Sequence, residues 1–339
     1  MPSVDHGRPD HGRPDQGGSV VLDPAVQRLV DASAAPPFLH EIGPQDGRQA
    51  LLESQGPVHA DPDVSVEFKV APVGPSGLVG FWIFKPAAVS EPPAVVLYAH
   101  GGRWMLGDAQ THGRLVSDLT VLTGHAFVVP EYTRTPEARY PVAIEESYAL
   151  LTWVVEAAAE LGVDGRRLAV AGDCAGATMA AALTLLAKRR SGPRIRAQLL
   201  YYPVLDARCE LPSHREFASG YLLTHEAVRW YWEQYCDDPR EQSEPTLSPL
   251  RASLDDLAGL PPALIICAEA DPVRDEGEAY AARLRAAGVD AHAVRYLGTV
   301  HDFASLTALR AMPPARAALR QGADFLRAGL APRTATGRP

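Results

Sequence analysis

The stretch RLAVAGDCAGA, residues 167–177, decides which fold this chain is expected to adopt. It begins as a short apolar run that suits a buried strand, and a helical pattern starts near Ala175. Gly172 and Gly176 flank the turn between the two elements, and small residues there permit a strained bend that pushes one side chain outward. That side chain is the thiol of Cys174, a candidate nucleophile. Its place at a helix N-terminus favours the thiolate, because free N–H groups stabilise negative charge.

The segments on either side of this stretch repeat the change from strand to helix. VSVEFKV and GLVGFWIFK alternate in polarity and predict a half-exposed hairpin. Six short apolar runs predict buried strands: AVVLYA, HAFVVP, RLAVAG, AQLLYYP, ALIICAE and AHAVRYL. Helical patterns lie between most of them, at 142–161, 175–190, 276–287 and 313–328. The alternation predicts an α/β fold with a mostly parallel sheet covered by helices on both faces.

Two regions do not follow this alternation of strands and helices. Residues 19–60 contain two short helical patterns before the first strand, and an insertion at about 207–250 carries the aromatic stretch LLTHEAVRWYWEQYC. An insertion at the carboxyl edge of a parallel sheet is well placed to cover a site, so we expect both regions to form a lid. The aromatic stretch is equally consistent with a helix that packs against the rest of the domain and makes no contact with a ligand. Residues 1–18, rich in Gly, Pro and charge, predict a disordered tail, and 19–339 predict a single domain.

Composition excludes several classes of function. The formal net charge of -9 argues against a nucleic-acid partner, which usually needs a concentrated basic face. The four cysteines form no CxxC-type motif, so we expect a reduced, cytoplasmic protein with no metal and no cofactor. The N-terminus lacks the apolar core of a signal peptide, and no apolar run reaches the ~18 residues of a membrane span.

A nucleophile of this kind needs a base and an orienting acid. Asp271 follows the strand-like run ALIICAEA, and His301 follows AHAVRYL, so both are expected at strand ends where functional loops emerge. The chain order of nucleophile, acid and base is that of α/β-hydrolase triads. Cys174, Asp271 and His301 are therefore the predicted catalytic residues.

The glycine-containing loop after AVVLYA predicts an oxyanion hole. Backbone N–H groups of Gly101, Gly102 and Arg103 are candidate donors there, and Ala175, directly after the nucleophile, is another. His100 is expected to brace this loop rather than to transfer protons. Together these parts predict a site for acyl transfer.

The motifs HGGRW, LGD, EYTRTPE, VAGDCAGA, YYPVLD, SPLRA, DPVRDEGEAYAARLRAAGV and VHDF together resemble the hormone-sensitive-lipase-like esterases. The resemblance spans about residues 61–328. It implies an α/β-hydrolase fold with a helical lid, action on short to medium acyl esters without a cofactor, and a homodimer.

Four departures from that family fall at the predicted site. Cys174 and Ala177 replace the serine and last glycine of GDSAGG, Arg103 replaces the third glycine of HGGG, and Asp302 replaces the glycine of HGF. The loop EYTRTPE also differs from the usual YRLAPE. An engineered cysteine would explain only the first change, so the set favours natural divergence.

The departures leave several functions open. A Cys-His-Asp triad can act on an ester or thioester of a small acyl substrate, and its thioester intermediate also suits an acyltransferase or a cyclase of secondary metabolism. A non-catalytic ligand-binding protein on a hydrolase scaffold is the rival from another class, which the presence of His301 disfavours. Arg103 either binds a substrate carboxylate or phosphate, including that of a pantetheine carrier, or pairs with Glu131 or Asp108. Trp104 and Tyr221 are expected to contact substrate.

Overall fold

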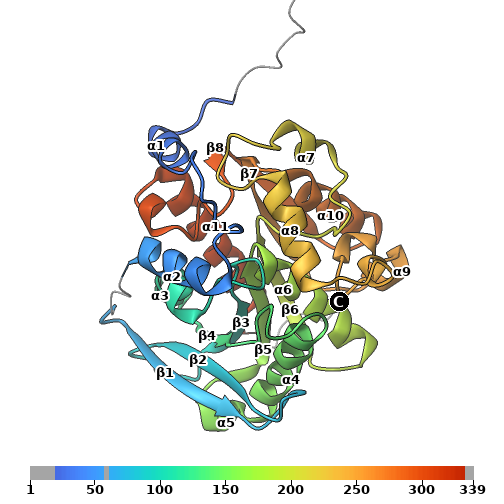
Figure 1. Ribbon diagram of the computed structural model, residues 1–339. Coiled ribbons are helices and arrows are strands. Elements are labelled where there is room, and N and C mark those ends of the chain that lie inside the picture. Colours follow the sequence, from blue (N-terminus) through green and yellow to red (C-terminus); the bar gives the residue numbers. More distant parts are fainter. Residues whose placement is uncertain (1–19, 57–60, 333–339) are drawn as a thin grey trace, which may run out of the picture.

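The computed structural model describes residues 20–56 and 61–332, so the predicted tail lies outside the described residues. One eight-stranded sheet has the order β1-β2-β4-β3-β5-β6-β7-β8 (Figure 1). The strands are β1 (Val64–Ala71), β2 (Val79–Pro86), β3 (Ala94–Ala99), β4 (Ala126–Pro130), β5 (Asp164–Asp173), β6 (Ile195–Tyr201), β7 (Ala263–Ala270) and β8 (Ala291–Val300). Strand β2 runs antiparallel to both of its neighbours, β1 and β4, and the other described strand pairs are parallel. The predicted α/β fold, its hairpin and its mostly parallel sheet are confirmed.

Helices occupy the connections between the strands. They are α1 (Pro24–Ala32), α2 (Pro44–Gln55), α3 (Ala109–Thr123), α4 (Val142–Glu156), α5 (Ala158–Leu161), α6 (Ala175–Arg189), α7 (Pro212–Glu216), α8 (His225–Tyr235), α9 (Leu254–Leu257), α10 (Arg274–Ala286) and α11 (Pro313–Gly329). The pattern predicted as one helix over 142–161 divides into α4 and α5 at Ala157, whose φ of -88° and ψ of 11° interrupt the helix. The other three predicted helices agree with α6, α10 and α11 within two residues.

Helices cover both faces of the sheet. Residues paired across strands share a face, and here Tyr201 pairs with Ile266 while the preceding Leu200 pairs with Ile265. A glycine of α11, Gly322, lies against Tyr201, whereas Gly277 of α10 lies against Ile265. Because successive strand residues point to opposite faces, α10 and α11 lie on opposite sides of the sheet.

The two predicted lid regions come together in space. In Figure 1, α1 (blue) and α7 and α8 (yellow) lie away from the β1–β2 hairpin, and α2 (blue) lies nearer to that hairpin, beside α3. Residues 32–40 and 222–231 supply most of the lining of one cavity of about 270 Å³, and Arg103 of the predicted oxyanion loop completes it. This arrangement places both regions beside the candidate site. That they move as a lid stays a prediction, as does the single-domain boundary.

Candidate active site

Cys174 occupies a strained turn between β5 and α6. Its φ of 51° and ψ of -123° are unfavourable for a residue with a Cβ atom. A Cβ atom on Gly172 would clash with the backbone of Gly176, and one on Gly176 would clash with the backbone of Ala99. The glycines therefore let the turn pack tightly, as the sequence predicted. The thiol is buried, with 1% of the residue exposed, so a substrate must reach it through the covering segments.

Asp271 and His301 lie directly after β7 and β8, at the same edge of the sheet as Cys174. Nδ1 of His301 is 2.7 Å from Oδ2 of Asp271, and both side chains are buried. The Sγ atom of Cys174 lies within 4.8 Å of a ring nitrogen of His301. Nε2 of His301 has no hydrogen-bond partner among the described residues, which leaves it free to exchange a proton with the thiol. The three predicted catalytic residues are thus brought together.

Electrostatics favour the protonated form of the histidine. Burial by itself lowers the pKa of His301, but the carboxylates of Asp271 and Asp302 outweigh it and raise the pKa well above its usual value. The ring also packs at 5.0 Å between centroids against Tyr202. An imidazolium held in this way can stabilise a thiolate and protonate a leaving group.

The glycine loop contains one donor fewer than predicted. The backbone N–H of Gly101 donates to Oδ1 of Asp173 over 3.0 Å, so Gly101 is not available to an oxyanion, and that assignment is corrected. The N–H groups of Gly102, Arg103 and Ala175 have no acceptor among the described residues. They remain the candidate oxyanion donors.

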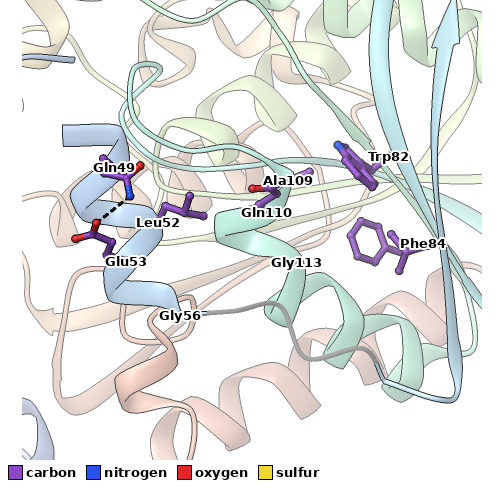
Figure 2. A pocket seen from close by; sticks show the side chains of 10 residues that line it. Gln49, Leu52, Glu53, Gly56, Trp82, Phe84, Ala109, Gln110 and Gly113 are labelled. Atoms are coloured by element: carbon purple, nitrogen blue, oxygen red, sulfur yellow. Dashed lines mark hydrogen bonds between the residues drawn. The ribbon is translucent and has the colours of Figure 1, made fainter. Parts of the chain in front are cut away.

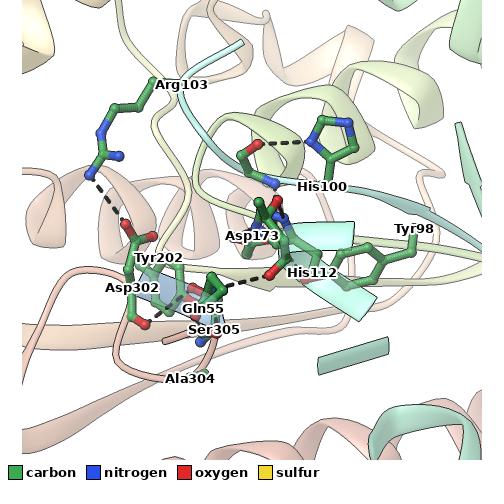
Figure 3. A network of polar contacts seen from close by, with 12 residues as sticks. Gln55, Tyr98, His100, Arg103, His112, Asp173, Tyr202, Asp302, Ala304 and Ser305 are labelled. Atoms are coloured by element: carbon green, nitrogen blue, oxygen red, sulfur yellow. Dashed lines mark hydrogen bonds and ion pairs between the residues drawn. The ribbon is translucent and has the colours of Figure 1, made fainter. Parts of the chain in front are cut away.

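The buried carboxylate of Asp173, which the sequence analysis missed, fixes this loop. It also accepts hydrogen bonds from the hydroxyl of Tyr98 at 2.7 Å and from Nε2 of His112 at 3.2 Å (Figure 3). Burial alone would raise the pKa of Asp173, but the charge and hydrogen bond of His112 lower it. Asp173 stands inside the quoted motif, yet no local pattern connects it with partners over 60 residues away.

His100 braces the glycine loop at residues 101–103, as expected. Its Nδ1 lies 2.9 Å from the carbonyl oxygen of Gly101, and its ring stacks on Tyr132 with 4.3 Å between centroids. Burial, and then the neighbouring His112, lower the pKa of His100 to about 3. A neutral ring at physiological pH fits a bracing role.

Arg103 and Asp302, two of the departures noted in the sequence, form a pair. A guanidinium nitrogen of Arg103 lies 3.2 Å from Oδ2 of Asp302, with side chains 9% and 14% exposed (Figure 3). The alternative partners Glu131 and Asp108 are therefore wrong. The other oxygen of Asp302 is 3.5 Å from Nε2 of His301. Arg103 also lies over the ring of Tyr231 at 5.5 Å, so the pair connects helix α8 with His301.

Two further side chains hold the loop that carries His301. The amide of Gln55, at the end of α2, donates to the carbonyl oxygens of Thr111 and Ser305, and its oxygen accepts from the N–H of Thr307. Arg114 of α3 donates to the carbonyl oxygens of Ala304 and Ser305. The sequence offered no signal for either role, because both depend on how distant segments meet.

The predicted substrate contacts Trp104 and Tyr221 lie in different surroundings. Trp104 is 2% exposed and stacks on Tyr235 of α8 at 4.3 Å, with Trp232 at 4.5 Å. It therefore connects the oxyanion loop to α8. Tyr221 is partly exposed and packs edge-on against Phe217. Substrate contact by either residue stays a prediction.

The cavity beside Arg103 is the better candidate for substrate. Its walls include Phe38, Leu222, Leu223 and Tyr231, with the Arg103 guanidinium as the charged group. A larger cavity of about 650 Å³ lies between α2, α3 and β2, where Trp82 and Phe84 face α3 (Figure 2). No predicted site residue lines it. Contact with Arg103, rather than size, therefore makes the smaller cavity the candidate for substrate binding.

Comparisons with known proteins agree with this geometry. A family model described as alpha/beta hydrolase fold matches residues 96–305. Carboxylesterase NlhH of Mycobacterium tuberculosis is 35% identical over 315 residues, which cover 91% of this chain and 96% of that protein. Ethyl acetate hydrolase of Pseudomonas putida is 36% identical over 227 residues, covering 64% of this chain and 71% of that protein.

Solved structures give the same result. A thermostable esterase from Pseudomonas putida superposes with a TM-score of 0.90 and 40% identity, covering 94% of this chain and all of that one. No helix among the described residues has the length and apolarity that crossing a membrane requires. The match over most of the chain, together with the elbow, the acid and the histidine, shows that this chain belongs to the hormone-sensitive-lipase-like α/β-hydrolase family.

Proposed function

We propose that this protein cleaves carboxylic esters or thioesters of small acyl groups through a covalent thioester on Cys174. The relatives named above are ester hydrolases, which supports the ester as substrate. The observation that carries the cysteine mechanism is the position of Cys174 Sγ within 4.8 Å of a ring nitrogen of His301, whose Nδ1 is bound to Asp271. No cofactor is required by these steps.

The reaction proceeds in two halves. In the first, the proton shared by Cys174 and His301 lies on Nε2 of His301, and the thiolate Sγ bonds to the carbonyl carbon of the substrate. The negative oxygen of the tetrahedral intermediate accepts hydrogen bonds from the N–H groups of Gly102, Arg103 and Ala175. The bond to the leaving group then breaks, and His301 gives that group its proton. In the second half, His301 removes a proton from water, which attacks the thioester and releases the acid and the thiol.

The alternative acceptor is a second substrate. Thioesters are good acyl donors to amines, thiols and alcohols, so an acyltransferase or a cyclising enzyme would use the same first half-reaction. A non-catalytic binding protein would keep the cavity but form no adduct. The three functions therefore differ in adduct formation and in the fate of the adduct.

Arg103 adds a proposed preference for anionic substrates. Its Nε–H is buried and has no hydrogen-bond acceptor among the described residues, while another nitrogen of the group is bound to Asp302. A carboxylate or phosphate in the cavity, including that of a pantetheine-carried thioester, would satisfy this donor. We expect Arg103→Gln to raise KM about tenfold for the p-nitrophenyl monoester of a dicarboxylic acid, and to change KM less for p-nitrophenyl acetate.

Intact-protein mass spectrometry after exposure to p-nitrophenyl acetate tests the mechanism. We expect one acetyl adduct, absent in Cys174→Ala and retained in the matched Cys236→Ala variant. Rapid loss of the adduct in water supports a hydrolase, whereas loss that accelerates only with added amine or thiol supports a transferase. A Cys174→Ala variant with full activity would refute the covalent mechanism.

Assembly and location stay predictions. The resemblance favours a homodimer, which analytical ultracentrifugation of the purified chain would detect as a doubled mass. A cytoplasmic location is expected from the free cysteines, and fractionation of the producing cells would check it.

A further inference from the structure

Three side chains at the candidate nucleophile form a group whose chemistry also suits a metal ion. Sγ of Cys174, a ring nitrogen of His301 and a carboxylate oxygen of Asp302 all lie within 4.8 Å of one another. Nε2 of His301 is 3.5 Å from Oδ1 of Asp302. Cys174 and His301 are buried, and the side chain of Asp302 is 14% exposed. One sulfur, one nitrogen and one oxygen thus lie close enough to be ligands of a single ion.

We propose that Cys174, His301 and Asp302 bind one divalent transition-metal ion of the zinc class, and that the bound ion blocks the proposed reaction. Zinc in proteins takes sulfur, imidazole and carboxylate ligands, and tetrahedral bonds of about 2.0–2.3 Å place two ligand atoms roughly 3.3–3.6 Å apart. Nε2 of His301 and Oδ1 of Asp302 already have this separation. The metal site does not depend on the proposed reaction, whereas the inhibition rests on it.

An unsatisfied nitrogen points into this group. Nε2 of His301 has no hydrogen-bond partner among the described residues, although the ring is fully buried. The carboxylate of Asp302 lies beside Nε2 without a hydrogen bond to it, and Nδ1 is already bound to Asp271. A buried polar atom without a partner is costly, and a metal ion bound to Nε2 would remove that cost.

Two neighbouring side chains would orient the ligands. Asp271 accepts a hydrogen bond from Nδ1 of His301, which leaves Nε2 as the nitrogen available to an ion. Arg103 binds Oδ2 of Asp302 at 3.2 Å, which leaves Oδ1 as the available oxygen. A carboxylate that fixes the tautomer and direction of a ligating histidine is a regular feature of metal sites.

The balance of charge also favours a divalent cation. Asp271, Asp302 and Arg103 together leave one negative charge in excess, and Cys174 and His301 share one proton. A divalent ion that displaces this proton would leave the whole group neutral. Binding should therefore release about one proton for each ion bound.

The site belongs to this chain rather than to its fold. Two of the three ligands, Cys174 and Asp302, are departures from the family that this chain resembles, which has serine and glycine there. A serine hydroxyl is a poorer zinc ligand than a thiolate, and glycine offers no side chain to bind. The sequence gave no metal motif, because Cys174 and His301 are far apart in the chain and meet only in the folded protein.

A bound ion would occupy both groups that begin the proposed reaction. A sulfur bound to metal is not free to attack a carbonyl carbon, and Nε2 bound to metal cannot hold a proton. Removing the ion with a chelator returns the proton to Cys174 and His301. Hydrolysis of p-nitrophenyl acetate should therefore be lost at saturating Zn²⁺ and recover after addition of EDTA.

Cobalt(II) titration of the full chain tests the metal site without using activity. We expect one equivalent of Co²⁺ to give a thiolate charge-transfer band and the visible bands of a tetrahedral ion, and a pH indicator in weak buffer to record the released proton. Cys174→Ala should abolish the charge-transfer band. The matched Cys209→Ala should keep it, although Cys209 lies in another trio of potential ligands with His214 and Glu276.

A double variant tests the third ligand. Arg103→Gly combined with Asp302→Gly keeps Cys174 and His301 and removes both charges of the pair together, and circular dichroism checks that it folds. We expect it to bind Co²⁺ about tenfold more weakly or worse. Loss of the arginine by itself would favour a cation, so weaker binding in the double variant reports the missing carboxylate.

Each result bears on one part of the proposal. Absence of saturable Co²⁺ binding, a charge-transfer band that survives Cys174→Ala, or equal affinity in the wild type and the double variant would overturn the metal site. A hydrolysis rate that Zn²⁺ leaves unchanged or raises would overturn the inhibition. Failure of the proposed function looks different: no nitrophenol is released without metal, while the Co²⁺ band of Cys174 remains.

Discussion

Arg103 and Asp302 are paired across the candidate active site at 3.2 Å, and both have left-handed backbone conformations, with φ values of 59° and 63°. The family that this chain resembles has glycine at both positions. A positive φ favours glycine there, because glycine adopts it without strain. This chain instead has two strained residues that compensate each other's charge. The substitutions therefore form one coupled change rather than two independent ones.

A double-mutant cycle measures that coupling. Arg103→Gly and Asp302→Gly should each lower the free energy of unfolding by about 2–3 kcal/mol, because each leaves a nearly buried charge unpaired. The free energy of unfolding of the double variant should lie within about 1 kcal/mol of the wild-type value. Both charges of the pair are removed together, and the backbone strain at both positions is relieved. Urea denaturation provides the values. The exposed pair Arg295 and Glu278 is the control, with coupling below about 1 kcal/mol. Additive effects of the two glycine substitutions would contradict the coupling.

Backbone strain at Cys174 predicts an unusual order of stabilities. Cys174→Gly should be more stable than Cys174→Ala by about 1 kcal/mol, because alanine keeps the Cβ atom that disfavours a φ of 51°. Both variants lack the thiol, so the comparison isolates the backbone. At Cys267, in the middle of β7, the order should reverse, since glycine weakens a strand. Thermal denaturation of all four variants tests this, and alanine as the more stable residue at 174 would argue against strain.

Trp104 should control the mobility of α8. Removing its ring in Trp104→Ala deletes the stacking on Tyr235 and Trp232, and we expect a loss of about 3–5 kcal/mol in stability. Hydrogen exchange should become faster in α8 and stay unchanged in α6. Trp153→Ala, which removes a ring packed on Phe81, should leave α8 exchange unaltered. Equal exchange in α8 for wild type and Trp104→Ala would mean that other contacts hold the helix.

Buried His100 predicts sensitivity to acid. Its pKa is lowered to about 3 from 6.5, so the unfolded chain takes up a proton below pH 6.5 before the folded chain does. Stability should therefore decrease as pH falls from about 6.5 toward 3, by about 1.4 kcal/mol per pH unit for one proton. His100→Gln should reduce this slope in denaturation series at several pH values. His292→Gln, an exposed control, should not change it, and an unchanged slope in His100→Gln would assign the proton uptake to other groups.

Several features of the site followed from the residues alone. The glycines around Cys174, and the order of Cys174, Asp271 and His301 after apolar strands, predicted the elbow and the triad positions. These predictions are local: a strand's polarity pattern and a turn's need for small residues are set by neighbours in the chain. The carboxyl ends of parallel strands then necessarily meet at one edge of the sheet.

Only the tertiary structure decided which distant side chains pair. Arg103 meets Asp302 across 199 positions of the chain, and Gly101 gives its N–H to Asp173 instead of leaving it for an oxyanion. Sequence patterns record whether a residue is buried and which element it joins. The partner of a buried polar group depends on strand order and helix packing, because those bring the only available donors and acceptors within bonding distance.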